Sequence, residues 1–113
     1  MHIHILTNEG AVAGGVDVEL ECPVCLRTSI QTLGYVGSLC RLCGCLTGDD
    51  WLGGIAEKRR LYMRKSRGDI AKVLGILPAT IRQYETVKCS RKYFDRLGEL
   101  VEIHNKQHTR STA

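Results

Sequence analysis

The sequence predicts an α+β protein made of two small units, a β unit held together by four cysteines and then an all-α unit. Three observations lead to this fold class. Two Cys-x2-Cys pairs lie between residues 22 and 43, apolar residues recur at helical spacing after residue 51, and charge is divided unevenly along the chain. We expect the β unit to span residues 1–48, the helical unit 49–104, and a flexible tail 105–113.

The uneven charge separates the two halves of the chain. Residues 1–54 carry two basic residues against six acidic ones, a net charge of −4, and residues 55–113 carry fourteen against six, a net charge of +8. This asymmetry indicates two functional halves, of which the second suits a polyanion. A solvated basic surface is the alternative that charge counts leave open.

The composition limits the class of protein further. Hydrophobic residues make up 43% and charged residues 25% of the 113 residues, as in a globular protein. No apolar run reaches membrane-spanning length and no secretion leader is present, so we expect a cytoplasmic protein. Two units of this size each bury little apolar surface, so at least one should need a metal as a staple.

Alternating residues predict the strands of the β unit. Residues 1–6 alternate as an edge strand, with His2 and His4 expected on its polar face rather than as metal ligands. Residues 16–21 alternate Val or Leu with Asp or Glu and should form a second, half-buried strand. Residues 29–36 should form a hairpin around Gly34.

Two Cys-x2-Cys sequences separated by fourteen residues form the strongest motif of the chain: Cys22, Cys25, Cys40 and Cys43. Matched pairs at this separation predict a tetrahedral four-thiolate site, in which each tight turn aims backbone N–H groups at its sulfurs. Gly44 supplies a permissive backbone directly after the second pair. The whole stretch resembles a zinc ribbon, and Zn²⁺ is the metal we expect.

Iron, disulfides, a redox motif and a different fourth ligand are the alternatives to this zinc site. Iron, as in rubredoxin-like sites, takes the same ligand geometry, but nothing in the sequence indicates electron transfer. Disulfides need an oxidising compartment, and a thioredoxin-like motif needs a strand-helix-strand setting. Cys45 could replace Cys43, but the spacing of Cys43 matches that of the first pair. Cys89 lies far along the chain and is expected to be an ordinary buried thiol.

A glycine-rich boundary at residues 46–54 precedes the first predicted helix. Asp49 or Asp50 should cap this helix, which begins near Trp51. Its apolar face should contain Leu52, Ile55, Ala56, Tyr62 and Met63, and its exposed basic face Lys58, Arg59, Arg60, Arg64 and Lys65.

Residues 66–85 predict two short helices joined by a tight turn. Ser66 should cap the first helix, with Asp69 as its partner in a capping box, and Gly75 should end it. Pro78 suits the first turn of the second helix. The apolar residues expected to face inward are Ile70, Val73, Leu74, Ile76, Ile81 and Tyr84.

The last predicted segment is one or two closing helices, which Gly98 could divide. Apolar and aromatic residues there repeat at intervals of three and four: Tyr93, Phe94, Leu97, Leu100, Val101 and His104. Residues 105–113 show no apolar periodicity, which is why we assign them to a tail.

The helix pair resembles the helix-turn-helix of lambda-repressor-like, or Xre-type, proteins over about twenty residues. The residues that carry this resemblance are Ser66, Ile70, Ala71, Val73, Leu74, Gly75, Ile76, Thr80, Ile81, Gln83, Tyr84 and Glu85. The resemblance implies that the second helix enters the DNA major groove.

Individual roles follow from this resemblance position by position. The base-reading residues would be Pro78, Ala79, Arg82 and Gln83, since arginine pairs with guanine and glutamine with adenine. The residues on the DNA backbone would be Arg67, Thr80, Lys88, Ser90, Arg91 and Lys92. For each basic residue, simple solubility is the alternative role.

The layout of a zinc ribbon followed by an Xre-type unit resembles antitoxins of the MqsA (YgiT) type. In that family the zinc unit binds a partner protein and the basic unit represses the operon. The resemblance implies a homodimeric repressor that binds an inverted-repeat operator in double-stranded DNA, with a protein partner at the zinc unit. This chain departs from the family in its long extension before the first cysteine and its shorter C-terminal part.

Two other classes of protein were considered. In one, the zinc unit binds a host protein such as RNA polymerase and the basic half is incidental. In the other, the chain is an enzyme, which needs an open metal position and a general base. Four thiolates close the tetrahedron and no convergent set of His, Asp and Glu is present, so we do not expect an enzyme.

Overall fold

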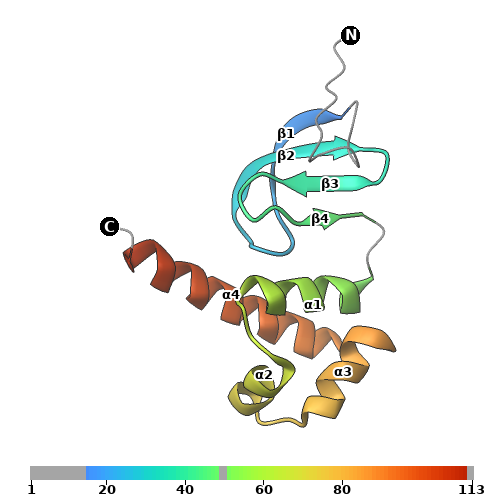
Figure 1. The fold of residues 1–113 in the computed structure, drawn as a ribbon, viewed down its shortest axis with the longest axis vertical. Coiled ribbons are helices and arrows are strands. Elements are labelled where there is room, and N and C mark those ends of the chain that lie inside the picture. The colour runs from blue at the N-terminus through green and yellow to red at the C-terminus, as the bar shows by residue number, and fades with distance from the viewer. Residues whose placement is uncertain (1–14, 49–50, 112–113) are drawn as a thin grey trace. The chain divides into compact units, whose positions relative to one another are not determined.

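The computed structural model describes residues 15–48 and 51–111, with side chains to residue 108. In these ranges the chain forms a four-stranded antiparallel sheet and then four helices (Figure 1). The α+β fold class is therefore confirmed. The chain divides into two compact units, residues 1–49 and 50–113, and each is described by itself. The strand predicted at residues 1–6 lies outside the described ranges.

The sheet of the first unit is a simple meander. Its strands are β1 (Val16–Glu21), β2 (Thr28–Gly34), β3 (Gly37–Cys40) and β4 (Leu46–Thr47), and they lie in that order. A hairpin is present as predicted, but its turn lies at residues 35–36 and not at Gly34, which ends β2 opposite Gly37. The register places Gln31 of β2 opposite Cys40 of β3, so the sheet leads directly into the second cysteine pair.

Burial in this sheet differs from the sequence-based expectation. The strand at 16–21 is present, but Val16 is 62% and Leu20 45% exposed, so its apolar side is not half-buried as predicted. The buried hydrophobic residues described in this unit are Cys22, Val24, Cys25 and Cys40. Because three of these four are thiols, the cysteine cluster takes the place of an apolar core.

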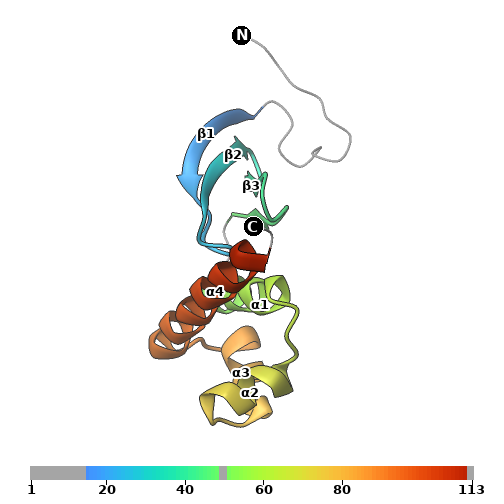
Figure 2. The same ribbon diagram turned by 90° about the vertical axis from the view of Figure 1, so that its left-hand side faces the viewer.

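The second unit contains α1 (Leu52–Tyr62), α2 (Arg67–Leu74), α3 (Pro78–Thr86) and α4 (Arg91–Ser111). Helix α1 packs against α3 and α4, and α2 packs against α3 (Figures 1 and 2). These contacts enclose a conventional hydrophobic core made of Ala56, Met63, Ile70, Ala71, Ile81, Tyr93, Phe94, Leu97 and Val101. No helix within the described ranges combines the length and apolar character needed to cross a membrane.

The start and end of α1 depart from simple capping. Trp51 occupies the N-cap without a side-chain hydrogen bond, and the predicted aspartate caps lie at residues 49 and 50, outside the described ranges. At the other end, Arg64 adopts a left-handed backbone with φ of 58°. Its N–H donates to the Leu61 carbonyl over 2.9 Å, and the N–H of Lys65 donates to the Arg60 carbonyl over 3.1 Å. This backbone conformation favours glycine, so the arginine there is strained.

Two arginines predicted on the exposed face of α1 are buried. Arg59 and Arg60 are each 7% exposed. Arg59 donates to the Phe94 carbonyl over 3.0 Å and lies 3.9 Å above the centre of the Phe94 ring. Arg60 pairs with Glu85 of α3. The prediction was wrong because both partners are far away in sequence, and periodicity treats every arginine as a surface residue.

The chemistry of α2 and α3 follows the sequence closely. The Ser66 hydroxyl accepts from the N–H of Asp69 over 3.0 Å, and the Asp69 carboxylate accepts from the N–H of Ser66 over 2.9 Å. Gly75 ends α2 in the left-handed region with φ of 70°, and Pro78 opens α3. The capping box, the glycine stop and the proline start are thus confirmed. Val73, in contrast, is 61% exposed and not buried as predicted.

Helix α4 is longer than predicted. It continues without a break through Gly98 and through residues 105–111, where the sequence predicted a tail without regular structure. The Tyr62 hydroxyl of α1 donates to Asn105 over 2.6 Å, and the rings of His104 and His108 stack with centroids 3.9 Å apart. These contacts hold the last turns of the helix without the apolar residues on which the sequence argument relied.

Candidate metal centre and nucleic-acid interface

The four cysteines sit on two turns with the same hydrogen-bond pattern. In the first turn the N–H of Leu26 donates to the Cys22 carbonyl, and in the second the N–H of Gly44 donates to the Cys40 carbonyl, both over 2.9 Å. Leu26 and Gly44 are both left-handed, with φ of 60° and 76°. The expectation for Gly44 is confirmed, and Leu26 adopts the same conformation at the price of strain.

Backbone and hydroxyl donors point at the sulfurs from both turns. The N–H of Val24 donates to Sγ of Cys22 over 3.4 Å, and the N–H of Cys43 donates to Sγ of Cys40 over 3.5 Å. The Ser29 hydroxyl of β2 lies 3.7 Å from the same Cys40 sulfur. These donors would stabilise negative charge on thiolates.

The sulfur positions match a tetrahedral metal site. All four Sγ atoms lie within 4.8 Å of one another, and the Cys22–Cys43 and Cys25–Cys40 pairs are each 3.8 Å apart. A tetrahedron with metal–sulfur bonds of about 2.3 Å has edges of about 3.8 Å. Disulfides would bring the sulfurs to about 2.05 Å, and all four thiols are free. The arrangement is compatible with a metal site, and zinc and iron fit it equally well by distance.

The pKa values of these thiols are raised at some cysteines and lowered at another. Burial raises the pKa of Cys25 to about 11, and the neighbouring Cys43 thiol together with burial raises the pKa of Cys22. At Cys40, burial acts in the same direction, but the N–H groups of Cys43 and Leu42 and the Ser29 hydroxyl outweigh it and lower the pKa to about 6. Four thiolates this close need a divalent cation to balance their charge.

The geometry also separates Cys43 from Cys45. Cys43 joins the cluster, whereas Cys45 occupies the place that Arg27 has in the first turn. The Arg27 carbonyl accepts a hydrogen bond from the N–H of Cys22 over 3.0 Å. The Cys45 carbonyl accepts the equivalent bond from the N–H of Cys40, also over 3.0 Å. The backbone role of Cys45 is therefore that of a turn residue.

Helix α3 buries one face and exposes the other. Ile81 is fully buried and Glu85 is 4% exposed. Three of the four residues predicted to read bases, Ala79, Arg82 and Gln83, are exposed away from this buried face. Pro78 is also exposed, but it lies in the first turn on the side of Ile81, three residues before it. Thr86 is also exposed and extends this face by one turn, with its hydroxyl bonded to the Arg82 carbonyl over 2.7 Å. The positions 79, 82, 83 and 86 follow helical spacing, so they form one continuous stripe.

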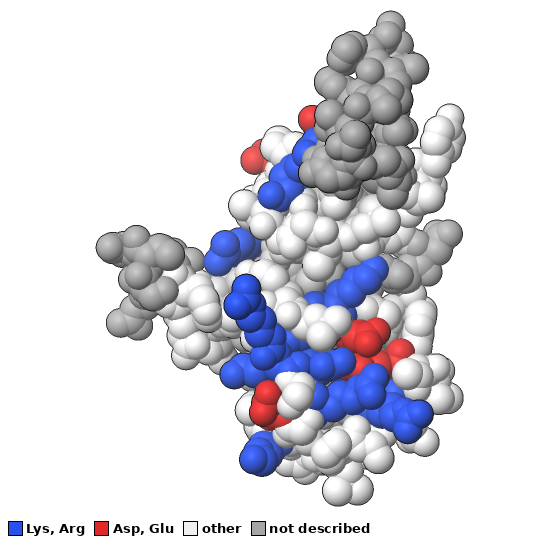
Figure 3. Space-filling model, in the orientation of Figure 1, with Lys and Arg blue, Asp and Glu red and all other residues white. Residues whose placement is uncertain are grey.

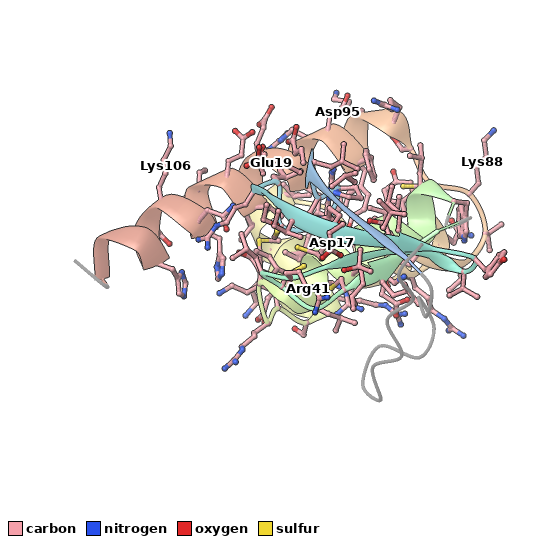
Figure 4. All side chains as sticks on the ribbon, turned by 90° about the horizontal axis from the view of Figure 1, so that it is seen from above. Asp17, Glu19, Arg41, Lys88, Asp95 and Lys106 are labelled. Carbon is pink, nitrogen blue, oxygen red and sulfur yellow. The ribbon has the colours of Figure 1, made fainter. Side chains whose placement is uncertain are left out.

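The residues predicted on the DNA backbone are more varied. Lys88, Arg91 and Lys92 are exposed, and Lys88 projects outward beyond α3 (Figure 4). Arg91 lies 3.3 Å from Asp95 one turn later. Thr80 is half-buried, and the hydroxyl of Ser90 caps α4 by accepting from the N–H of Tyr93 over 3.3 Å. Ser90 thus has a structural role that the sequence analysis did not assign.

Glu85 is the residue of this region that the sequence analysis missed. Its carboxylate has no exposed surface and accepts from Arg60 over 2.7 and 3.2 Å and from Arg67 over 2.9 Å. The contact uses one of the five N–H donors of Arg67, whose side chain is 36% exposed. Glu85 follows the buried Ile81 by four residues, a spacing that would have placed it on the inner face.

This ion-pair cluster and one glycine fix α3 against α1. A Cβ atom on Gly53 would lie 2.5 Å from the Tyr84 carbonyl oxygen, so the two helices touch at that point. A buried ion pair that loses one partner typically costs about 3–5 kcal/mol, so Arg60 and Glu85 hold the helices in one position. The exposed stripe of α3 is therefore carried by a rigid helix.

No protein-family model, no curated protein and no solved structure matches this chain.

Proposed function

We propose that this protein is a sequence-specific DNA-binding transcriptional regulator whose α2–α3 pair is a helix-turn-helix. The observation that carries the proposal is the exposed stripe of α3, which contains both Arg82 and Gln83 and belongs to a helix held by buried ion pairs. Arginine and glutamine can each form two hydrogen bonds to one base edge in the major groove. A helix of this diameter fits that groove.

The charge distribution supports the same function. Residues 55–113 carry a net charge of +8, and basic side chains gather over the helical unit in one view (Figure 3). Lys88, Arg91 and Lys92 flank the end of α3 and the start of α4, where they would contact phosphates next to the groove. Arg67 would add a phosphate contact while still bound to Glu85.

The two kinds of contact give distinguishable results in binding experiments. Replacing Arg82 or Gln83 by alanine should cost about 1–3 kcal/mol on the preferred duplex and change the preference at one base position. Lys88→Ala should weaken binding to every duplex alike and lower the slope of log affinity against log salt by about one. Titration of labelled duplexes at several salt concentrations measures both. Unchanged specific binding by Arg82→Ala and Gln83→Ala would refute base reading by α3.

For the first unit we infer a structural Zn²⁺ bound by Cys22, Cys25, Cys40 and Cys43 in a zinc ribbon. The four thiolates would fill a tetrahedral shell, and the metal would replace the missing apolar core. We further propose that the protein binds an inverted-repeat operator as a homodimer, as two half-sites about 34 Å apart require. A repressor of the antitoxin kind fits this layout.

A second function rests on the surface of the sheet. Val16 and Leu33 lie opposite each other in β1 and β2 and are 62% and 36% exposed, and Leu20 on the same side is 45% exposed. Exposed apolar residues on a small sheet mark a protein-binding surface. In this alternative the zinc unit binds a protein such as RNA polymerase. Loss of partner binding by Val16→Asp, with duplex binding unchanged, would support it.

A further inference from the structure

A groove in the helical unit lies outside both sites described above. It has a volume of about 900 Å³ and is lined by residues from the end of α1, from helix α2 and from the C-terminal half of α4. Its floor includes Met63, Ile70 and Leu100, and two further apolar residues on its walls are largely exposed. Val73 of α2 is 61% exposed and Ile103 of α4 is 51% exposed. Exposed valine and isoleucine facing one groove indicate a binding surface.

The rim of this groove is basic. Arg64, Lys65 and Lys72 line it and are exposed. Among the described lining residues Asp69 is the one carboxylate, and it already accepts the N–H of Ser66 over 2.9 Å. The groove thus combines an apolar floor with a positive rim.

Arg64 gives an independent sign that this rim is functional. It adopts φ of 58° at the end of α1, where glycine is the unstrained choice and an L side chain costs about 1 kcal/mol. Its exposed side chain lines the groove and forms no ion pair or hydrogen bond with the side chains described at residues 51–108. The backbone hydrogen bonds that end α1 hold this conformation, and the arginine side chain stays at the rim, where it can contact a ligand.

We propose that this groove binds an acidic amphipathic helix of a partner protein. Such a helix would place apolar residues at intervals of three and four on Val73 and Ile103, and its flanking carboxylates on Arg64 and Lys72. Nucleic acid would match the rim but has no apolar stripe for the floor. A second copy of the chain is a poor occupant for two reasons. Pairing groove with groove would bring two basic rims together. The end of α4 from another copy could not fill the groove either, because Lys106, Gln107 and His108 supply no apolar residue.

A designed peptide tests this proposal without knowledge of the natural partner. The probe is an 18-residue helix with leucines at intervals of three and four and glutamates elsewhere, and a scrambled peptide of identical composition is the control. Titration into the ¹⁵N-labelled full chain should shift the amide signals of Val73, Ile103 and Arg64 and leave those of Arg82 and Gln83 in place. The striped peptide should bind at least tenfold more tightly than the scrambled one.

Variants separate binding from folding. Ile103→Glu and Lys72→Glu should each lower the affinity for the striped peptide at least tenfold. Duplex binding and the dispersed amide spectrum of the folded protein should be retained. Arg64→Gly should lower the peptide affinity severalfold and yet raise the melting temperature, because glycine removes the backbone strain. The matched control Lys92→Glu, in the first turn of α4 and outside the lining of the groove, should leave peptide affinity unchanged.

Three outcomes would overturn the proposal. One is equal binding of striped and scrambled peptides, and another is a set of shifts confined to α3. The third is concentration-dependent shifts of Val73 and Ile103 without peptide, abolished by Ile103→Glu, which would assign the groove to a second copy of the chain. None depends on whether α3 reads DNA, so the two proposals fail separately.

Discussion

At the scale of single residues, Gly44 carries the tight turn after the second cysteine pair. Its φ is 76°, and a Cβ placed there would meet no atom within 4 Å. An alanine would therefore be destabilising only through the strained backbone conformation and not through a clash. We expect Gly44→Ala to destabilise the metal-bound turn by about 1 kcal/mol. Competition with a zinc chelator should show zinc release at roughly fivefold lower chelator concentration. Leu42→Ala, an exposed change in the same turn, is the control, and equal midpoints for all three proteins would contradict the expectation.

Tyr93 contributes a buried hydroxyl that has no hydrogen-bond partner in the described part of the chain. Its ring stacks on Tyr84 with centroids 4.7 Å apart, and phenylalanine keeps that contact. Because an unsatisfied buried hydroxyl is unfavourable, Tyr93→Phe should leave stability at pH 7 unchanged or raise it by about 1 kcal/mol. Urea unfolding followed by circular dichroism measures this, and a loss of stability would mean that the hydroxyl has a partner.

The same residue predicts a dependence on alkaline pH. Burial, and then the negative charge of Glu85, raise the pKa of the Tyr93 phenol above its usual value of about 10. A raised pKa stabilises the fold below pH 10, and this contribution is lost as pH rises through the folded pKa, because the unfolded chain ionises first. The unfolding free energy of Tyr93→Phe should therefore fall less steeply above pH 10 than that of the native protein. Equal slopes of the unfolding free energy against pH for the two proteins would show that Tyr93 ionises freely in the folded state.

At the scale of elements, the contact between α1 and α3 depends on Gly53. An added Cβ would collide with the Tyr84 carbonyl and the Trp51 ring, so Gly53→Ala must push the helices apart. We expect a loss of about 1–3 kcal/mol, as for overpacking of a core, and weaker duplex binding because α3 shifts. The matched control is Gly68→Ala in α2, whose Cβ would lie 3.7 Å from its nearest neighbour and should stabilise by up to about 1 kcal/mol. Equal melting temperatures for both variants would contradict the close contact.

The elements also show which features the sequence could predict. The cysteine turns, the capping box at Ser66 and the glycine stop at Gly75 depend on neighbouring residues only, and all three were predicted correctly. The exposed face of α3 follows from the inward positions predicted for Ile81 and Tyr84, of which Ile81 is fully buried. Local chemistry was sufficient for these.

The errors concern contacts between residues distant in sequence. Arg60 is buried because Glu85 lies opposite it, and Arg59 because the Phe94 carbonyl accepts a hydrogen bond from its guanidinium. The last turns of α4 are held by the Tyr62–Asn105 hydrogen bond across 43 positions. The exposure of Val73 could not be predicted either: its spacing is that of a core residue, but no element of residues 15–48 or 51–111 covers it.

At the scale of the whole molecule, the two units are stabilised by different kinds of interaction. The first has a thiol cluster in place of an apolar core, and the second has a core of aliphatic and aromatic residues. Removal of zinc should therefore unfold residues 15–48 and leave residues 51–111 folded. Amide spectra recorded before and after chelation would show collapse of the β1–β4 signals alone. Unfolding of both units together, or of neither, would contradict this division.

Acid should have the same effect as the chelator. The thiols must lose their protons to bind the metal, and the pKa of Cys25 is raised to about 11 in its absence. Metal affinity should therefore increase with pH and fall as protons compete for the sulfurs. A zinc affinity independent of pH between 5 and 8 would be inconsistent with four thiolate ligands.

The central claim is that α3 reads DNA sequence, and selection from a random duplex library tests it most directly. The native protein should enrich one motif with two inverted half-sites centred about 34 Å apart. Arg82→Ala should enrich the same motif with the preference lost at one position of each half-site, and Lys88→Ala should enrich the unchanged motif more weakly. Enrichment of no motif by the zinc-loaded native protein, or an identical motif at full strength from Arg82→Ala, would contradict the claim.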